Sequence, residues 1–317
     1  MPKVAVVTTG GTIASTRDAH GISRPAITGA DLVGNEQTDI DLRVVNVMSK
    51  DSSSMTFADM DRVRDAVADE LKDPGLDSVV VLHGTDTMEE TAFLLDLHHD
   101  DQRPVVFTGA QRTFDHPESD ARSNLAAAIS AGLDISSLGR GVLIAFGGSV
   151  HPAAGTRKSD TTALDAFRPV HIDPLLLRTS EPLPWHPISD TRVDIIAVYP
   201  GADRVQIDAC VHAGAQGLVL DGLGSGNANP TIVEAVRDCV GAHIPVAVTT
   251  RVSSGHISPV YGGGGGGHDL IAAGAVFSTD LRAGQARVLL AALLSDPNLV
   301  GLEKEFERRA SLSRVRA

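Results

Sequence analysis

The sequence predicts a two-domain α/β protein, with a larger N-terminal domain built on a flavodoxin-like or Rossmann-like parallel sheet and a smaller C-terminal α/β domain. The 317 residues exceed the usual limit for one hydrophobic core. Short runs rich in Val, Ile and Leu alternate with amphipathic segments along the chain. Such runs are typical of strands buried on both faces, and the helical segments between them imply right-handed crossovers in a parallel sheet.

Five apolar runs predict the strands of the N-terminal domain, and they read KVAVVTT, LRVVNV, DSVVVLHG, RPVVFTG and GVLIAFGG. Residues 56–71 predict a helix, because four apolar side chains recur there at helical spacing, namely Met60, Val63, Val67 and Leu71. We expect this stripe to pack on the sheet.

A connector between domains is predicted at SEPLPWHPISD, residues 180–190, which has three prolines and no periodicity. We therefore divide the chain into domains 1–184 and 185–317. The second domain repeats the alternation with strands in RVDIIAVYP, GLVLDGLG and IPVAVTTR and a closing helix near residues 285–294. In PTIVEAVRDCVG, Pro230 suits the start of a helix and Gly241 suits its end.

Six consecutive glycines, Gly262–Gly267, cannot hold one conformation by themselves, because glycine loses the most backbone freedom on ordering. The run is therefore either a plain mobile loop or a lid, and we favour the plain loop.

The composition argues against several functions. The chain has 40 Asp and Glu and only 27 Lys and Arg. The resulting net charge of −13 would repel nucleic acid and anionic membranes. No apolar run approaches about 20 residues and no signal peptide precedes the first strand, so we expect a soluble, cytoplasmic protein. Cys210 and Cys239 lack metal-ligand spacing and are interpreted as small buried side chains.

Polar groups follow three of the predicted strands or turns of the first domain. They are Thr8 to Thr12, Asp51 to Met55, and Gly84 to Thr87. Because ligands gather at the carboxyl ends of parallel strands, we expect these segments to converge on one edge of the sheet.

Each segment also has a local explanation. The Gly10-Gly11 pair could expose amide hydrogens as an oxyanion hole or serve a dinucleotide, but TGGTIAS lacks the third glycine of GxGxxG. Thr12 or Thr85 could cap a helix, and Asp86 could favour a helix dipole. Thr87 is interpreted as the cap of the helix that follows it.

Several of these segments resemble a known family. TTGGTIAS at residues 8–15 and VVLHGTDTMEETAFLL at residues 79–94 are similar to the two signature regions of the bacterial-type L-asparaginases, the asparaginase/glutaminase amidohydrolases. The resemblance extends through DSSSM, VVFTGAQR, DARSNLAAAI, RKSDTTALDAF and DGLGSGNANP, in this order and over nearly the whole chain.

The resemblance implies a role for each candidate residue. Thr12 is the nucleophile that attacks the side-chain amide, Thr85 is the second essential threonine, and Asp86 holds the substrate ammonium. The family's lysine maps onto Lys158, and its serine that binds the substrate carboxylate maps onto Ser52.

The chemistry explains why these groups are needed. A threonine hydroxyl is almost wholly protonated near neutrality, so it must pass its proton to a base or a relay as it attacks. Thr85 bonded to Lys158 would be that relay, and backbone amides near Gly11 and Thr85 would stabilise the oxyanion. Lys158 accepts a proton only when it is neutral; burial disfavours its ammonium form and a nearby Asp86 favours it.

The sequence departs from the family at three places. The segment after the first signature, STRDAHGISRPAIT, lacks the tyrosine that closes over the nucleophile in many members, and Ser23 is the nearest substitute. Ser53 stands where glutamine is common, which leaves one contact to the substrate ammonium unfilled. VYGGGGGGHDL has no acid at the family's glutamate position, where Tyr261 is a candidate for the site or a strand-end aromatic.

Asn227 in GSGNANP matches an asparagine that, in the family, enters the site of a neighbouring subunit. The resemblance therefore implies a homo-oligomer, by analogy a homotetramer of close dimers. It implies hydrolysis of L-asparagine, with L-glutamine as a candidate second substrate and with no metal and no organic cofactor. Three alternatives are an amidase subunit of a transfer-RNA amidotransferase, an amino-acid sensor without turnover, and a nucleotide-binding domain.

Overall fold

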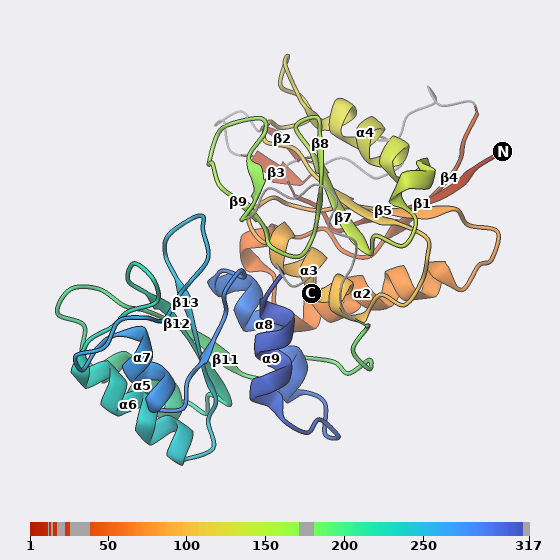
Figure 1. Cartoon of the computed structure of the whole chain (residues 1–317). Coiled ribbons are helices and arrows are strands. Elements are labelled where there is room, and N and C mark those ends of the chain that lie inside the picture. Colours follow the sequence, from red (N-terminus) through yellow and green to blue (C-terminus); the bar gives the residue numbers. More distant parts are fainter. Residues whose placement is uncertain (12, 14, 18–22, 26–38, 171–180, 313–317) are drawn as a thin grey trace. The chain divides into compact units, whose positions relative to one another are not determined.

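The computed structural model describes residues 1–11, 13, 15–17, 23–25, 39–170 and 181–312. The chain divides into two compact units, Met1–Pro169 with Asp173–Leu183 and Val170–Ile172 with Pro184–Ala317. Figure 1 shows the helices and strands of each unit. The predicted α/β class, with a larger parallel-rich sheet first and a smaller one second, is confirmed.

The sheet of the first unit has the strand order β4-β1-β5-β6-β7-β8. Its strands are β1 (Lys3–Thr8), β4 (Asp41–Asn46), β5 (Ser78–Leu82), β6 (Val105–Thr108), β7 (Val142–Phe146) and β8 (Ser149–Pro152). The first five pair in parallel, whereas β8 runs antiparallel to β7. The hairpin turn at Gly147-Gly148 has φ of 57° and 80°, the left-handed conformation that a two-residue hairpin of this type requires.

Helices cover both faces of this sheet (Figure 1). Helices α2 (Phe57–Leu71) and α3 (Met88–His98) pack on one face, and α4 (Ala121–Leu133) packs on the other. Alternate side chains of each strand enter the two cores, so that Val79 and Val81 face α2 and α3 while Val80 and Leu82 face α4. The predicted stripe on residues 56–71 packs on the sheet as expected.

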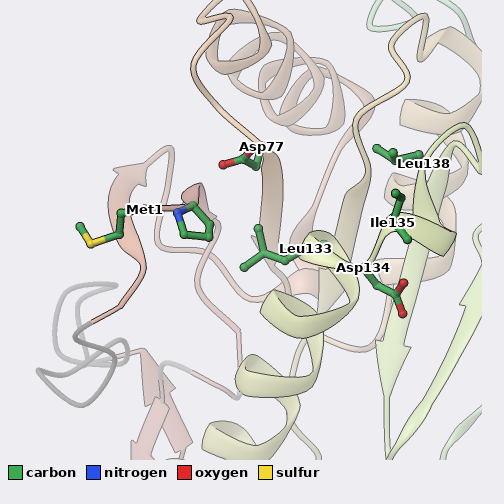
Figure 2. A pocket seen from close by; sticks show the side chains of 8 residues that line it. Met1, Asp77, Leu133, Asp134, Ile135 and Leu138 are labelled. Atoms are coloured by element: carbon green, nitrogen blue, oxygen red, sulfur yellow. The ribbon is translucent and has the colours of Figure 1, made fainter.

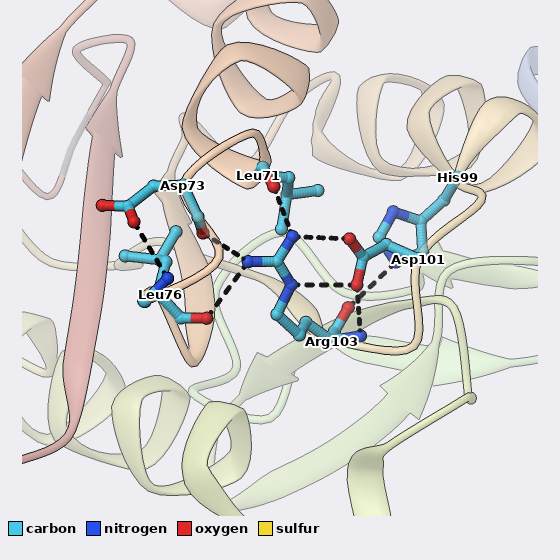
Figure 3. A network of polar contacts seen from close by, with 7 residues as sticks. Leu71, Asp73, Leu76, His99, Asp101 and Arg103 are labelled. Carbon is cyan, nitrogen blue, oxygen red and sulfur yellow. Dashed lines mark hydrogen bonds and ion pairs between the residues drawn. The ribbon is translucent and has the colours of Figure 1, made fainter.

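Arg103 closes the C-terminal end of α2 (Figure 3). Its guanidinium donates to the carbonyls of Leu71, Asp73 and Leu76, the last two at 2.7 and 3.1 Å. Asp101 pairs with the same guanidinium at 2.6 Å, and this contact lowers the pKa of Asp101. A cation here satisfies carbonyls that have no partner within the helix, so Arg103 fixes α2 against the start of β6.

A small antiparallel pair, β9 (Thr156–Lys158) and β10 (Phe167–Pro169), carries the predicted lysine. Phe167 is the register partner of Lys158, and its ring packs on Phe146 at the end of β7, with 5.0 Å between the ring centroids. The pair is therefore anchored in the core next to the carboxyl edge of the main sheet. A second short pair joins β2 (Ser15–Arg17) to β3 (Ser23–Pro25).

The second unit has a four-stranded parallel sheet in the order β11-β12-β13-β14. The strands are β11 (Val193–Ala197), β12 (Gly217–Gly222), β13 (Val246–Thr250) and β14 (Val276–Phe277). The helices are α5 (Val205–His212), α6 (Pro230–Gly241), α7 (Gly267–Ala272), α8 (Ala283–Leu294) and α9 (Leu302–Ala310). Helix α6 begins and ends where the sequence predicts, with Asn229 accepting from the Ile232 amide as its N-cap.

Other residues hold part of the glycine run, which the sequence interprets as a plain loop. The amides of Gly264 and Gly266 donate to Asp269 Oδ2 at 2.8 and 2.9 Å, and Gly267 opens α7. Asp269 lies in the first turn of that helix and supplies the order that the glycines lack. Local composition does not reveal this contact.

We predict that Gly266→Ala destabilises the protein far more than Gly262→Ala. A Cβ at position 266 would lie 2.0 Å from the carbonyl oxygen of Tyr261, whereas a Cβ at position 262 meets nothing nearer than 3.9 Å. We expect Gly266→Ala to lower the free energy of unfolding by roughly 2 kcal/mol or more. Urea unfolding of both variants measures this; equal stabilities would contradict the rigid turn.

Candidate active site

Two glycines bring three chain segments together at the carboxyl edge of the first sheet. Gly11 follows β1, has φ of +85°, and lies so close to Gly84 that a Cβ on Gly11 would stand 2.5 Å from the Gly84 Cα. A Cβ on Gly84 would stand 2.5 Å from Ser52 Oγ. The segments after β1 and β5 therefore touch through backbone, and the segment after β4 reaches Gly84 with the Ser52 side chain, in the arrangement expected at the edge of a parallel sheet.

Lys158 bridges the threonine and the aspartate of the second signature. Its Nζ donates to Thr85 Oγ1 at 2.8 Å and to Asp86 Oδ1 at 3.2 Å. Thr85 is 5% exposed, whereas 57% of the Asp86 side chain is open to solvent. The structure thus brings Thr85, Asp86 and Lys158 together, with the hydroxyl inside and the carboxylate at the surface.

Ser52 links this cluster to the turn after β4. Its buried hydroxyl oxygen accepts from the Asp86 amide at 3.2 Å, and its carbonyl accepts from the Thr87 hydroxyl at 2.9 Å. Thr87 occupies the N-cap position of α3, but its side chain makes no capping bond. The predicted cap position of Thr87 is therefore confirmed, whereas its hydroxyl ties the two loops together and does not cap the helix.

The turn that presents Ser52 is fixed by a capping box at α2. Ser52–Ser54 form a short 3-10 helix, and Thr56 and Asp59 cap α2 reciprocally. Lys50 Nζ pairs with Asp59 Oδ2 at 2.6 Å. Burial raises the pKa of Asp59, but its hydrogen bonds to Lys50 and Thr56 outweigh burial and lower the pKa to about 2. Ser53 is exposed on this turn.

His83 is fully buried directly before Gly84, and burial lowers its pKa to about 4. Its Nδ1 lies 2.7 Å from the Gly84 carbonyl oxygen. A carbonyl only accepts, so the neutral ring donates from Nδ1 and orients the peptide that leads into Thr85.

Glu89 is a member of the cluster that the sequence did not reveal. Its Oε2 accepts from the backbone amide of Lys158. Burial raises the pKa of Glu89 to about 7, with a smaller upward contribution from Glu90. Glu89 lies four residues after Thr85, and that spacing is the one local signal that could have drawn attention to it.

Thr12, the predicted nucleophile, lies outside the described residues, as does the Ser23 side chain. Asn227 and Tyr261 belong to the second unit. Asn227 Oδ1 accepts from the Gly267 amide at 3.1 Å, and its backbone pairs with that of Leu223. The side chain of Asn227 is therefore oriented by the glycine run, while Tyr261 is 60% exposed.

A surface hollow of about 550 Å³ lies at the opposite, amino edge of the first sheet (Figure 2). Its lining comes from the start of β1, the approach to β5 and the end of α4, and it includes Met1, Asp77, Leu133 and Ile135. None of the candidate residues that the structure describes lines it.

Metal-binding and membrane-spanning features are both absent from the described part of the chain. No group of three or more His, Cys, Asp and Glu side chains is arranged to hold a metal ion within residues 1–11, 13, 15–17, 23–25, 39–170 and 181–312. No helix in these ranges combines the length and the apolar character needed to cross a bilayer.

Sequence comparison places both units in one family. Residues 3–186 match the asparaginase N-terminal domain, and residues 192–299 match the glutaminase/asparaginase C-terminal domain. With the fold described above, these matches define a two-domain α/β hydrolase. The chain belongs to the asparaginase family, as its sequence predicts.

Individual relatives agree with this assignment. A probable L-asparaginase of Deinococcus radiodurans is 34% identical, with 98% of this chain and 97% of the relative aligned. An L-asparaginase of Bacillus licheniformis is 30% identical over 92% of this chain and 95% of the relative. The crystal structure of a probable cytoplasmic L-asparaginase from Campylobacter jejuni superposes with a TM-score of 0.81 at 26% identity, covering 98% of this chain and 99% of that one.

We predict that Asp59→Asn destabilises the protein at neutral pH and much less near pH 2. The folded-state pKa of about 2 lies below the ordinary value of 3.8, so the stabilisation is present above about pH 4 and is lost as the pH falls through 2. We expect a loss of roughly 1–3 kcal/mol at pH 7. Denaturant unfolding at several pH values measures it.

Asp69→Asn is the matched control, because Asp69 forms an exposed pair with Lys72 on the same helix. Because solvent screens an exposed pair, it should contribute little to the free energy of unfolding. A similar loss in both variants, or an Asp59→Asn effect that does not depend on pH, would contradict the role given to Asp59.

Proposed function

We propose that the protein is an L-asparaginase that hydrolyses the side-chain amide of L-asparagine to L-aspartate and ammonia through a threonine acyl-enzyme. The observation that carries the proposal is the 2.8 Å bond from Lys158 Nζ to Thr85 Oγ1 beside the open carboxylate of Asp86. Family membership and full-length L-asparaginase relatives support it.

In the proposed reaction, the Thr12 hydroxyl attacks the amide carbon and gives up its proton. Thr85 and Lys158 form the relay that moves protons, and backbone amides near Gly11 and Thr85 stabilise the oxyanion. The carbon–nitrogen bond then breaks, and the leaving nitrogen takes a proton and departs as ammonia. Water hydrolyses the acyl-threonine ester, which releases aspartate and restores the Thr12 hydroxyl. The proposed reaction uses no metal or organic cofactor.

The substrate's charged groups determine the other roles. Asp86 is exposed enough to receive the ammonium, although its carboxylate also contacts Lys158. The Ser52 hydroxyl accepts from the Asp86 amide, so its own hydrogen can be donated to the substrate carboxylate. Ser53, Asn227 and Tyr261 complete the proposed binding set. Glutamine is a proposed secondary substrate, because one methylene changes discrimination by only about 1–3 kcal/mol.

A second candidate is an amidase that supplies ammonia within a transfer-RNA amidotransferase. One chain of the glutamyl-tRNA(Gln) amidotransferase of Methanosarcina mazei is 30% identical over 98% of this chain and 77% of its own length. Such a protein would favour glutamine, whereas a sensor would bind without turnover. Ammonia release from the isolated chain, with asparagine and glutamine compared, distinguishes these candidates.

We further propose a cytoplasmic homotetramer of close dimers in which Asn227 and Tyr261 serve the site of a neighbouring subunit. The cytoplasmic location is supported by the similarity to the probable cytoplasmic L-asparaginase of Campylobacter jejuni. Shared sites are supported by the family pattern that GSGNANP matches at residues 224–230.

We predict that Thr12→Ala and Thr85→Ala each reduce ammonia release from asparagine by about 1,000-fold or more, because one removes the nucleophile and the other breaks the relay. An enzyme-coupled assay of ammonia release tests this, and circular dichroism shows whether each variant is folded. Ser54→Ala, on the exposed side of the turn that carries Ser52, is the control and should stay active. Near-normal turnover by either threonine variant would refute the assignment.

We predict that two inactive variants complement each other. When Thr85→Ala and Asn227→Ala chains exchange subunits, half of the dimers are mixed, and each mixed dimer has one fully intact site. About one quarter of the wild-type rate should return. Ammonia release after mixed refolding measures it. A mixture no more active than the sum of its parts would mean that Asn227 serves its own subunit's site.

A further inference from the structure

The backbone amide and the side-chain amine of Lys158 both bond to one short stretch of chain. Its Nζ bonds to Thr85 and Asp86, while its backbone amide donates to Glu89 Oε2. The three acceptors lie within residues 85–89, which join the end of β5 to the first turn of α3. A strand that is 69 to 73 residues away in sequence is thereby tied to the signature by its backbone as well as by its side chain.

The backbone bond is the more restrictive of the two ties. A lysine ammonium sits on a flexible four-carbon stem and can reach its partners from many backbone positions. The amide has no such freedom, so its bond to Glu89 fixes where β9 stands relative to α3. Packing of Phe167 on Phe146 holds the β10 side of the pair, and Glu89 holds the side that faces the signature.

We propose that Glu89 is a positioning residue that sets the place of Lys158 relative to Thr85 and makes the reaction depend on whether the Glu89 carboxyl group is ionised. This inference rests on the proposed amidohydrolase function, in which Lys158 and Thr85 move protons.

The surroundings of Glu89 explain the dependence on ionisation. Among the described residues, the charged groups that act on it include Glu90 on α3 and Arg157 and Lys158 on β9. Burial and Glu90 favour the neutral carboxyl group, whereas Arg157, Lys158 and the bond from the Lys158 amide favour the carboxylate, and the resulting pKa is about 7. An ionised acceptor makes the stronger hydrogen bond, so the tie to Lys158 loosens as the pH falls through this value.

A simpler role for Glu89 is to stabilise the amino end of α3 through the helix dipole. Glu90 occupies the same first turn and would share that role. Only Glu89 is bonded to the Lys158 amide among the contacts described. Glu90 variants therefore separate a helix effect from an effect on Lys158.

The test compares Glu89→Ala, Glu89→Gln and Glu90→Gln by kcat and KM for asparagine between about pH 5.5 and pH 9. We expect Glu89→Ala to lower kcat by about 10- to 100-fold with KM within about threefold, because a small misplacement of Lys158 slows proton transfer more than binding. Glu89→Gln keeps an acceptor oxygen but cannot ionise. It should recover part of the lost kcat, and the inflection near pH 7 in the plot of kcat against pH should disappear. Glu90→Gln should keep the wild-type kcat and the wild-type inflection.

A second readout does not depend on activity. Exchange of the Lys158 amide hydrogen, followed by nuclear magnetic resonance, should be faster in Glu89→Ala than in the wild type or Glu90→Gln. If the wild type released no ammonia, the proposed function would fail, and amide exchange would still test the tie. Wild-type kcat in Glu89→Ala, an unchanged inflection in Glu89→Gln, or unchanged exchange would each overturn the inference. Should Glu89→Ala not fold, Glu89→Gln carries the test.

Discussion

Three segments meet at the carboxyl edge of the first sheet, and they can do so because Gly84 has no side chain. The rest of the candidate site depends on this close approach. A Cβ there would stand 2.5 Å from Ser52 Oγ and 3.3 Å from the Gly11 Cα. Because no Cβ stands there, the Ser52 hydroxyl reaches the Asp86 amide and the Thr87 hydroxyl reaches the Ser52 carbonyl. Any larger residue at position 84 would push the turn after β4 away from the signature and break both hydrogen bonds.

Around this contact the polar groups are arranged by depth. The Thr85 hydroxyl is buried, the Lys158 side chain is 20% exposed, and the Asp86 side chain is 57% exposed. An amine between a buried hydroxyl and an open carboxylate suits a relay that ends at solvent, because a proton can leave without crossing the core. The buried ring of His83 stays neutral near pH 7, so it orients the Gly84 peptide without competing for that proton.

The fold was readable from the sequence because its signals are local. Continuous apolar runs predicted the strands, and the stripe from Met60 to Leu71 predicted α2. The contact between Lys158 and Thr85 was implied by the resemblance alone, since no local pattern links residues 73 apart. The sequence did not reveal Glu89, the bond from the Thr87 hydroxyl to Ser52, or the bonds from the glycine amides to Asp269, for the same reason. Each depends on a partner that only the folded chain brings near.

Two of the three departures from the family pattern, at Ser53 and at the glycine run, fall where we propose that the substrate binds, and the third is the missing tyrosine after the first signature. Thr85, Asp86 and Lys158 match and lie together, whereas Ser53 is a short exposed side chain where glutamine is common. The glycine run carries no acid where the family pattern leads us to expect one, and its Gly267 amide orients the Asn227 side chain. Proton transfer tolerates little displacement, while contacts to a substrate ammonium can be redistributed among neighbours.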